Sequence, residues 1–215
     1  YQLSLLDHPT DGEIVIDGVE VMGLSSEDRT EFRLHELGYV FQDYALVPDL
    51  SARENVMVPL LMRGMTWEEA KQKSDTAIDN VGLKGKYQNL PSQLSGGEQQ
   101  RIAIARAIAG SPKIIFADVP TANLDSISGE AIIALLDCLH ESGQTIVMVT
   151  HDVETLIALS DRVAVLAEQR VIAVGTLNEI SHLDHPFIVN FFKNIRHKMD
   201  SYHYSEQSWK TVLMP

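Results

Sequence analysis

Short apolar runs alternate with longer helical patterns along this chain. The runs at 37–41, 113–118 and 144–150 are bounded by polar residues, which is typical of buried parallel strands. The stretch 26–35 is polar and helical, and 127–139 carries apolar residues at the spacing of one packed helix face. Strands and helices that alternate in this way predict an α/β fold with a parallel sheet.

A helical insert is predicted between the first two of these strands. Ser51 is followed three residues later by Glu54, and Thr66 by Glu69, which is the spacing of a capping box that begins a helix. Together these starts predict helices over about residues 51–90, with Trp67 as a residue of the helix packing. The later chain is predicted to hold a helix at 153–159 and strands at 162–166 and 170–174 that form a hairpin.

The two ends of the chain carry weaker patterns. Residues 12–17 alternate like an edge strand, and 187–196 could form an amphipathic helix that packs on the domain or on a partner. Residues 202–215 are mixed in character, and we expect little regular structure there.

The run at 94–101, Leu-Ser-Gly-Gly-Glu-Gln-Gln-Arg, is the most informative segment for function. Ser95, Gly96 and Gly97 stand directly before an apolar helix, whose first N–H groups are free and carry partial positive charge. Such a helix start suits a phosphate. On its own, the same triplet is equally typical of an ordinary helix cap.

Polar side chains follow each predicted strand. Asp118 ends the second strand, His151 and Asp152 follow the third, and Gln42 follows the first. In open α/β sheets ligands bind at the carboxyl ends of the strands, and an aspartate there commonly holds the magnesium of a nucleotide. Taken singly, Asp118 could cap a helix, His151 could form a surface pair with Asp152, and Gln42 could be an ordinary loop amide.

In this order, the motifs resemble those of the ATP-binding cassette (ABC) ATPases, the nucleotide-binding subunits of membrane transporters. The resemblance covers roughly residues 1–175. The matching segments are 41–42 for the Q-loop, 94–99 for the signature, 114–118 for Walker B, 122–125 for the D-loop and 150–152 for the switch-histidine loop.

The resemblance implies a P-loop NTPase-like parallel-sheet core, truncated at its N-terminus, with a helical signature subdomain. It implies an ATPase domain over 1–175, the helical subdomain at about 43–110 within it, and a C-terminal helix and tail over 176–215. Family members sandwich two ATP molecules in a head-to-tail dimer, so a second cassette subunit, either the same chain or a different one, is an expected partner.

The resemblance also assigns roles to individual residues, with ATP and Mg²⁺ as cofactors. Gln42 and Asp118 are expected to ligate Mg²⁺, and His151 to contact the γ-phosphate and the attacking water. The residues expected to contact nucleotide through the signature and D-loop are Ser95, Gly96, Gly97, Glu98 and Asp125.

A transmembrane permease is the other expected partner. Residues 5–14 and 120–125 are similar to the lipoprotein-release and macrolide-export type of cassette, which favours export or extraction from a membrane. The transported substrate is not readable from the chain. The residues that could line the permease socket, although most of them are more typical of a core, are Tyr44, Leu46, Val47, Met57 and Leu61.

Two departures from the family pattern bear on activity. No glycine-rich loop ending in Gly-Lys-Ser/Thr occurs in the sequence, and aligning residues 9–13 with the family places Tyr1 just past that lysine. We therefore expect a fragment.

Val119 stands where the family carries the glutamate that polarises water, and loss of such a base typically slows a reaction by about 10²–10⁴-fold. Whether the chain is an active enzyme is thus uncertain, and Val119 fits either an altered ordinary cassette or a degenerate site.

Composition and charge argue against several other classes of protein. A net charge of -13 argues against a nucleic-acid surface, and no apolar run approaches the roughly 20 residues of a membrane span. We expect a cytoplasmic protein that is peripheral on the inner membrane face through its permease. The single Cys138 fits a reducing compartment and a buried helix position. His182, His185 and His197 lack ligand spacing and are expected to be solvated, so no zinc site is expected.

Rival functions share some of these motifs. A nonhydrolysing regulatory cassette would contribute only its signature to a neighbour, and Val119 favours that alternative. Chromosome-maintenance and repair ATPases insert a long heptad coiled coil before the signature, and 43–93 has neither the length nor the pattern. A translation-factor cassette normally carries two cassettes, and one is seen here.

Overall fold

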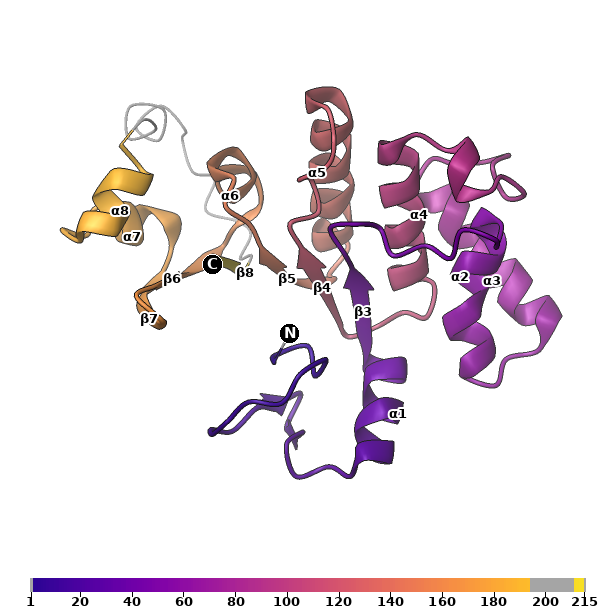
Figure 1. Ribbon diagram of the computed structural model, residues 1–215, viewed down its shortest axis with the longest axis horizontal. Helices are drawn as coiled ribbons and strands as arrows, with labels where there is room; N and C mark the ends of the chain where they lie inside the picture. Colours follow the sequence, from indigo (N-terminus) through magenta and orange to yellow (C-terminus); the bar gives the residue numbers. More distant parts are fainter. Residues whose placement is uncertain (1, 194–210, 215) are drawn as a thin grey trace. The chain divides into compact units, whose positions relative to one another are not determined.

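The computed structural model describes residues 2–193 and 211–214 (Figure 1). Contacts divide the chain into two compact units, which are described in turn. Unit 1 comprises the residues up to 40 together with 46–116, and unit 2 comprises 41–45 together with 117–215. The expected domain boundary at 175 stays a prediction.

A bundle of three helices makes up the larger part of unit 1 (Figure 1). The helices are α2 (Ala52–Met62), α3 (Trp67–Asn80) and α4 (Gly96–Ile108), with the short 3-10 helix η1 (Pro91–Gln93) before α4. Each of the three packs on the other two, and their fully buried side chains include Val56, Leu60, Ile78 and Ile102. Ser51 and Thr66 form the predicted capping boxes with Glu54 and Glu69, which confirms the predicted helix starts.

The rest of unit 1 holds α1 (Ser26–Glu36), β3 (Leu37–Val40) and an antiparallel pair, β1 (Val15–Ile16) and β2 (Val19–Glu20). The edge strand expected at 12–17 is thus shorter than predicted. Strand β3 packs on α4 so closely that a Cβ on Gly38 would lie 2.7 Å from the Ala107 carbonyl oxygen. Only glycine allows that approach.

Unit 2 follows the predicted order of elements closely. It contains α5 (Ser126–Glu141), β5 (Thr145–Val149), α6 (Val153–Leu159), β6 (Arg162–Ala167), β7 (Arg170–Gly175), α7 (Leu177–Ser181) and α8 (Pro186–Phe191). Strand β4 (Ile114–Asp118) enters this unit with its last two residues. Strands β6 and β7 form the predicted antiparallel hairpin. Helix α8 covers part of the expected helix at 187–196, and 194–196 lie outside the described residues.

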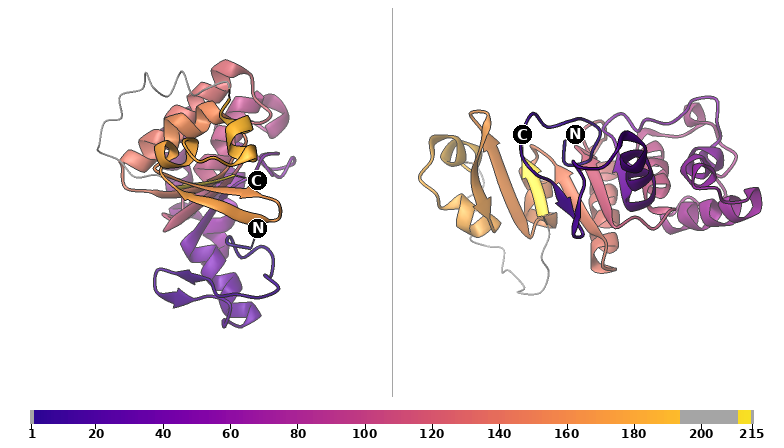
Figure 2. Two further views of the ribbon diagram at one scale, coloured as in Figure 1. Left: turned by 90° about the vertical axis from the view of Figure 1, so that its left-hand side faces the viewer. Right: turned by 90° about the horizontal axis from the view of Figure 1, so that it is seen from below.

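A strand near the C-terminus, β8 (Thr211–Met214), lies between β5 and β6 and is parallel to both. Figure 2 shows it in yellow among the orange strands. The expectation of little regular structure over 202–215 is wrong for these residues, while 202–210 and 215 lie outside the described part. The physical reason is that facing strand edges require backbone partners, and a short extended segment supplies them on both sides.

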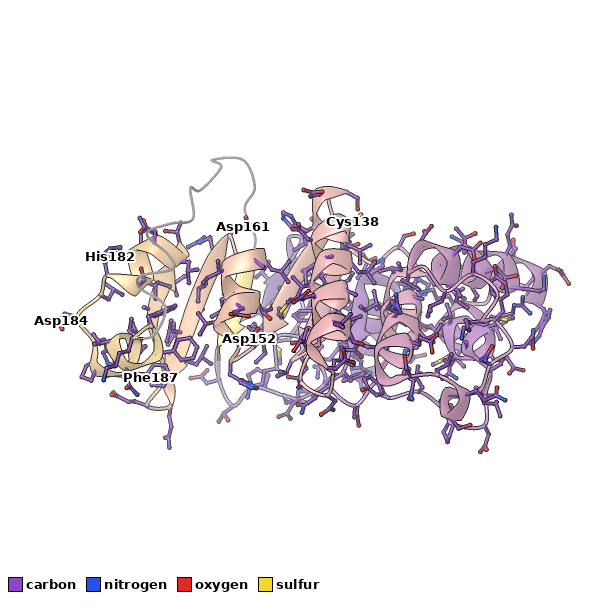
Figure 3. The ribbon with its side chains drawn as sticks, turned by 90° about the horizontal axis from the view of Figure 1, so that it is seen from above. Cys138, Asp152, Asp161, His182, Asp184 and Phe187 are labelled. Carbon is purple, nitrogen blue, oxygen red and sulfur yellow. The ribbon has the colours of Figure 1, made fainter. Side chains whose placement is uncertain are left out.

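Two expectations of burial are also wrong. Cys138 is exposed on α5 (Figure 3), because it lies two residues after the buried Leu136, and about 100° per residue turns it to nearly the opposite side of the helix. Trp67 is 56% exposed rather than packed, because it is the first residue of α3 and precedes the first buried position on that helix, Ala70.

Candidate nucleotide-binding site

The signature residues lie at the start of α4 in unit 1. Ser95 is the N-cap: its hydroxyl accepts a hydrogen bond from the Glu98 N–H at 3.3 Å, and the Glu98 carboxylate accepts one from the Ser95 N–H at 2.9 Å. This capping box orders the first turn of α4. The N–H groups of Gly96 and Gly97 belong to the helix start, where no acceptor exists within the helix. The same helix start can therefore form an ordinary N-terminal cap and also accept a phosphate.

Glu98 remains ionised in this arrangement. The Ser95 N–H bond holds the pKa of its carboxyl below the usual value, and the Lys86 ammonium, 3.1 Å from Oε1, lowers the same pKa further. A negative charge therefore stands close to the turn that would receive a phosphate.

In unit 2, the ends of β4 and β5 lie side by side. Asp118 is the last residue of β4, and the N–H of the next residue, Val119, donates to the Val149 carbonyl at the end of β5 at 2.9 Å. Thr150 and His151 continue directly from β5. The structure thus brings the half-buried Asp118 and the exposed His151 to neighbouring strand ends, as the sequence predicts for their placement.

His151 lies in the link between β5 and α6, where the residues on both sides of it are hydrogen-bonded. Thr150 Oγ1 accepts from the Asp152 N–H at 3.1 Å, and Asp152 caps α6 by accepting from the Glu154 and Thr155 N–H groups at 3.3 and 2.9 Å. Asp152 therefore serves as a helix cap (Figure 3), while the His151 side chain faces solvent.

Gln42 lies in a loop that is bonded to the loop after β4. The Asn123 side-chain amide donates to the Gln42 carbonyl at 3.0 Å, and the Tyr44 hydroxyl donates to the Asn123 carbonyl at 3.4 Å. Tyr44 and Ala45 both have left-handed backbones, with φ of 65° and 46°. Asn123 is the residue that the sequence reasoning missed, because its bond joins segments 81 positions apart.

Val119 and Asp125 complete the residues of interest. Val119 has φ of 38°, a left-handed conformation that is strained for a β-branched side chain, and its isopropyl group accepts no proton. Asp125 caps α5 by accepting from the Ser128 N–H at 3.0 Å and from its hydroxyl at 2.7 Å. These bonds lower the pKa of the Asp125 carboxyl.

The side-chain oxygens expected to bind Mg²⁺ suit that ion only when phosphate oxygens and waters complete its coordination. Asp118 supplies one carboxylate and Gln42 one amide oxygen, and Mg²⁺ is commonly held by one or two carboxylates plus waters and substrate phosphates. Among the described residues, no group of three His, Cys, Asp or Glu side chains could hold a metal by itself.

The histidines expected to be solvated have ordinary surroundings where the structure describes them. His182 is exposed and its Nδ1 lies 2.7 Å from the Asn178 carbonyl, and His185 caps α8. His197 lies outside the described residues.

Residues 2–122 match the family model described as ABC transporter. The chain belongs to this family. Its α/β fold with a parallel sheet agrees with solved cassettes: it superposes on the dimeric post-hydrolysis state of the ATP-binding cassette MJ0796 bound to ADP and Pi. The TM-score is 0.73 at 40% identity, covering 82% of this chain and 78% of the other.

Named ABC relatives are similar over most of this chain. The lipoprotein-releasing system ATP-binding protein LolD of Syntrophotalea carbinolica is 44% identical over 170 residues, which is 79% of this chain and 74% of LolD. The macrolide export ATP-binding/permease protein MacB of Aggregatibacter actinomycetemcomitans is 40% identical over 171 residues, which is 80% of this chain and 26% of MacB. No helix in the described part of the chain is long and apolar enough to cross a membrane.

Proposed function

We propose that this chain is an ATP-binding subunit of an ABC transporter, in which the nucleotide drives movement of a substrate across or out of a membrane. The observation that carries the proposal is the pairing of strand ends in unit 2, which brings Asp118 beside the segment that bears His151. A carboxylate and an imidazole at this edge suit a metal-bound triphosphate.

Each residue has a defined task in this proposal. The Asp118 carboxylate and the Gln42 amide oxygen hold Mg²⁺, which when bound neutralises charge on the phosphates. His151, which lies between the hydrogen-bonded Thr150 and Asp152, donates toward the γ-phosphate. Ser95, Gly96 and Gly97 offer the start of α4 to the nucleotide of a second cassette, and Glu98 maintains that start by its capping bond. Asp125 orders the first turn of α5, at the loop expected to face the second subunit.

Two roles are proposed for this chain: it offers its signature to a second cassette, and it hydrolyses its own nucleotide. The signature has the more complete set of residues. The capping box and glycines of the signature are complete, whereas Val119 offers no acceptor for a proton of water. Without such a base, hydrolysis is expected to be about 10²–10⁴-fold slower. A nonhydrolysing regulatory cassette is accordingly the second candidate function, and the Val119 side chain is the observation that favours it.

The substrate and membrane partner are proposed from the relatives. LolD is named for lipoprotein release and MacB for macrolide export, and we place this chain in a transporter of that group, on the cytoplasmic face with a permease. Met57 is buried, which agrees with the core alternative, so it is not available for a permease contact. The candidate Val47 is exposed, and the exposed apolar side chains of α2 and α3 are Val58, Met62 and Trp67.

Mixing the chain with a cassette that carries its own phosphate-binding loop tests the trans contribution. We expect the partner's ATPase rate to rise with added chain, and Gly97→Asp to abolish the rise, because it adds a carboxylate at the buried glycine of the helix start. Lys84→Met, at an exposed lysine outside the signature, is the control. An unchanged partner rate with the unmodified chain would contradict the proposal.

A further inference from the structure

One loop of unit 1 holds the starts of two helices. The Ala52 N–H donates to the Asn89 carbonyl at 2.8 Å, and the Arg53 N–H donates to the Tyr87 carbonyl at 2.9 Å. Both N–H groups belong to the first turn of α2, where the helix itself supplies no acceptor. The loop over residues 81–90 therefore caps α2 from outside.

Side chains fix the same loop to α2 and α3. The Arg53 guanidinium forms two hydrogen bonds with the Asp75 carboxylate, at 2.6 and 3.1 Å, and lies 5.0 Å from the centre of the Tyr87 ring. The Tyr87 hydroxyl donates to Asp79 at 2.5 Å. A paired guanidinium that also faces an aromatic ring has little freedom, so Tyr87 and its neighbour Lys86 have a defined position.

Lys86 extends from this loop to the signature. Its Nζ lies 3.1 Å from Oε1 of Glu98, while Oε2 of Glu98 accepts the Ser95 N–H at 2.9 Å. One oxygen of the Glu98 carboxylate therefore contacts Lys86 in the loop, and the other accepts the hydrogen bond from the N-cap residue Ser95. The Glu98 side chain is 20% exposed and that of Lys86 is 42% exposed.

The signature helix differs in this respect from the other capped helices. Glu54, Glu69 and Glu179 form the same capping box at α2, α3 and α7. Among the described residues, Glu98 is the one of these four glutamates that forms an ion pair with a lysine or arginine. Capping hydrogen bonds, and then more distant cations, lower the pKa of the other three carboxyls. The direct ion pair is found at the capping box whose helix start is proposed to meet a phosphate, where an uncompensated carboxylate would repel the ligand.

We propose that Lys86 is a positioning residue of the signature: it fixes the Glu98 carboxylate in the cap and offsets its charge, so that the turn at 95–97 can accept phosphate. This rests on the proposed trans contribution to a second cassette. Its action is through Glu98, and no contact between Lys86 and nucleotide is required.

Lys86→Met keeps most of the side-chain stem and removes the charge. With the partner cassette present, we expect the ATP concentration for half-maximal rate to rise roughly two- to fivefold, the size suited to a partly exposed ion pair. The maximal rate and the melting temperature should change little, and Lys86→Arg should restore the wild-type value. The matched control is Lys84→Met, two residues away and exposed.

A double-mutant cycle assigns the effect to Glu98. In a Glu98→Gln background the same lysine substitution should have a much smaller effect, because the charge that it compensates is gone. Equal effects of Lys86→Met in both backgrounds, or an effect no larger than that of Lys84→Met, would overturn the inference.

Amide exchange separates this inference from the proposed function. If the unmodified chain fails to stimulate the partner, the proposed function fails, and exchange at residues 95–99 then decides the role of Lys86. Faster exchange there in Lys86→Met than in Lys84→Met supports the positioning role. Identical exchange in the two variants refutes it.

Discussion

The start of α4 and the end of β4 are built very differently, although both are proposed to meet nucleotide. At α4, a serine, two glycines and a glutamate adopt favourable conformations, and the capping box closes with both hydrogen bonds. At β4, a β-branched valine occupies a left-handed conformation at a position where the family expects an acid. The backbone conformation is thus favourable at the start of α4 and strained after β4. The helix start proposed as the signature is therefore preformed, whereas the strand end proposed for hydrolysis carries a strained residue.

Removing core volume beneath the signature should produce the largest change. Ile102 is fully buried in α4, and Ile102→Ala should lower the free energy of unfolding by about 2–5 kcal/mol, because it leaves a cavity. Urea unfolding measures this. Leu156→Ala, at a fully buried position of α6 in unit 2, is the matched variant. A loss below about 1 kcal/mol at Ile102 would contradict the tight packing of the signature helix.

Relieving the strain at Val119 should have the next largest effect. Asparagine tolerates a left-handed backbone better than valine does, so Val119→Asn should raise the free energy of unfolding by about 1 kcal/mol. The melting temperature reports the change. Val47→Asn, at an exposed valine outside the left-handed region, should give no gain. Destabilisation by Val119→Asn would show that the valine side chain contributes more packing than its backbone costs.

Removing the signature cap should give a comparable or smaller effect of opposite sign. Ser95→Ala deletes the hydroxyl that accepts the Glu98 N–H, which should cost about 1 kcal/mol of stability. Thermal unfolding measures it. Ser92→Ala, at an exposed serine in η1, should have less effect. If the two variants are equally stable, the Ser95 hydroxyl is not stabilising α4.

The smallest expected effect is a pH dependence at Glu98. Its pKa is lowered in the folded chain from the ordinary value of 4.5, chiefly by the Ser95 N–H and then by Lys86. The stabilisation is therefore fully present above pH 4.5 and is lost as pH falls through the lowered pKa. The difference in melting temperature between wild type and Glu98→Ala should be constant from pH 7 to 5 and shrink below 4.5. A difference that persists unchanged well below that range would exclude the ionised carboxylate as its source.

Features that depend on neighbouring residues were predictable from the sequence. The capping boxes at Ser51 and Thr66, the helix at 153–159 and the hairpin after it are set by local spacing, and the structure confirms them. The placement of Asp118 at a strand end follows from the abrupt end of an apolar run. The roles of the site residues stay predictions.

Features that depend on distant pairing were not predictable. The Asn123 amide contacts a carbonyl 81 positions away, and no local pattern marks that bond. Strand β8 is four residues long and pairs in parallel with strands made much earlier in the chain. Cys138 was misassigned because apolar neighbours surround it in sequence, whereas the helix turns it away from the buried Ile132 and Leu136.

The position of β8 also has a consequence for biosynthesis. A ribosome releases β5 and β6 before it releases residues 211–214, yet each of the two strands pairs with β8 in the finished sheet. During that interval both strands expose backbone groups able to pair with other nascent chains. Unit 2 is therefore prone to wrong pairing while it is being synthesised, whereas the three helices of unit 1, made within residues 52–108, have no such delay.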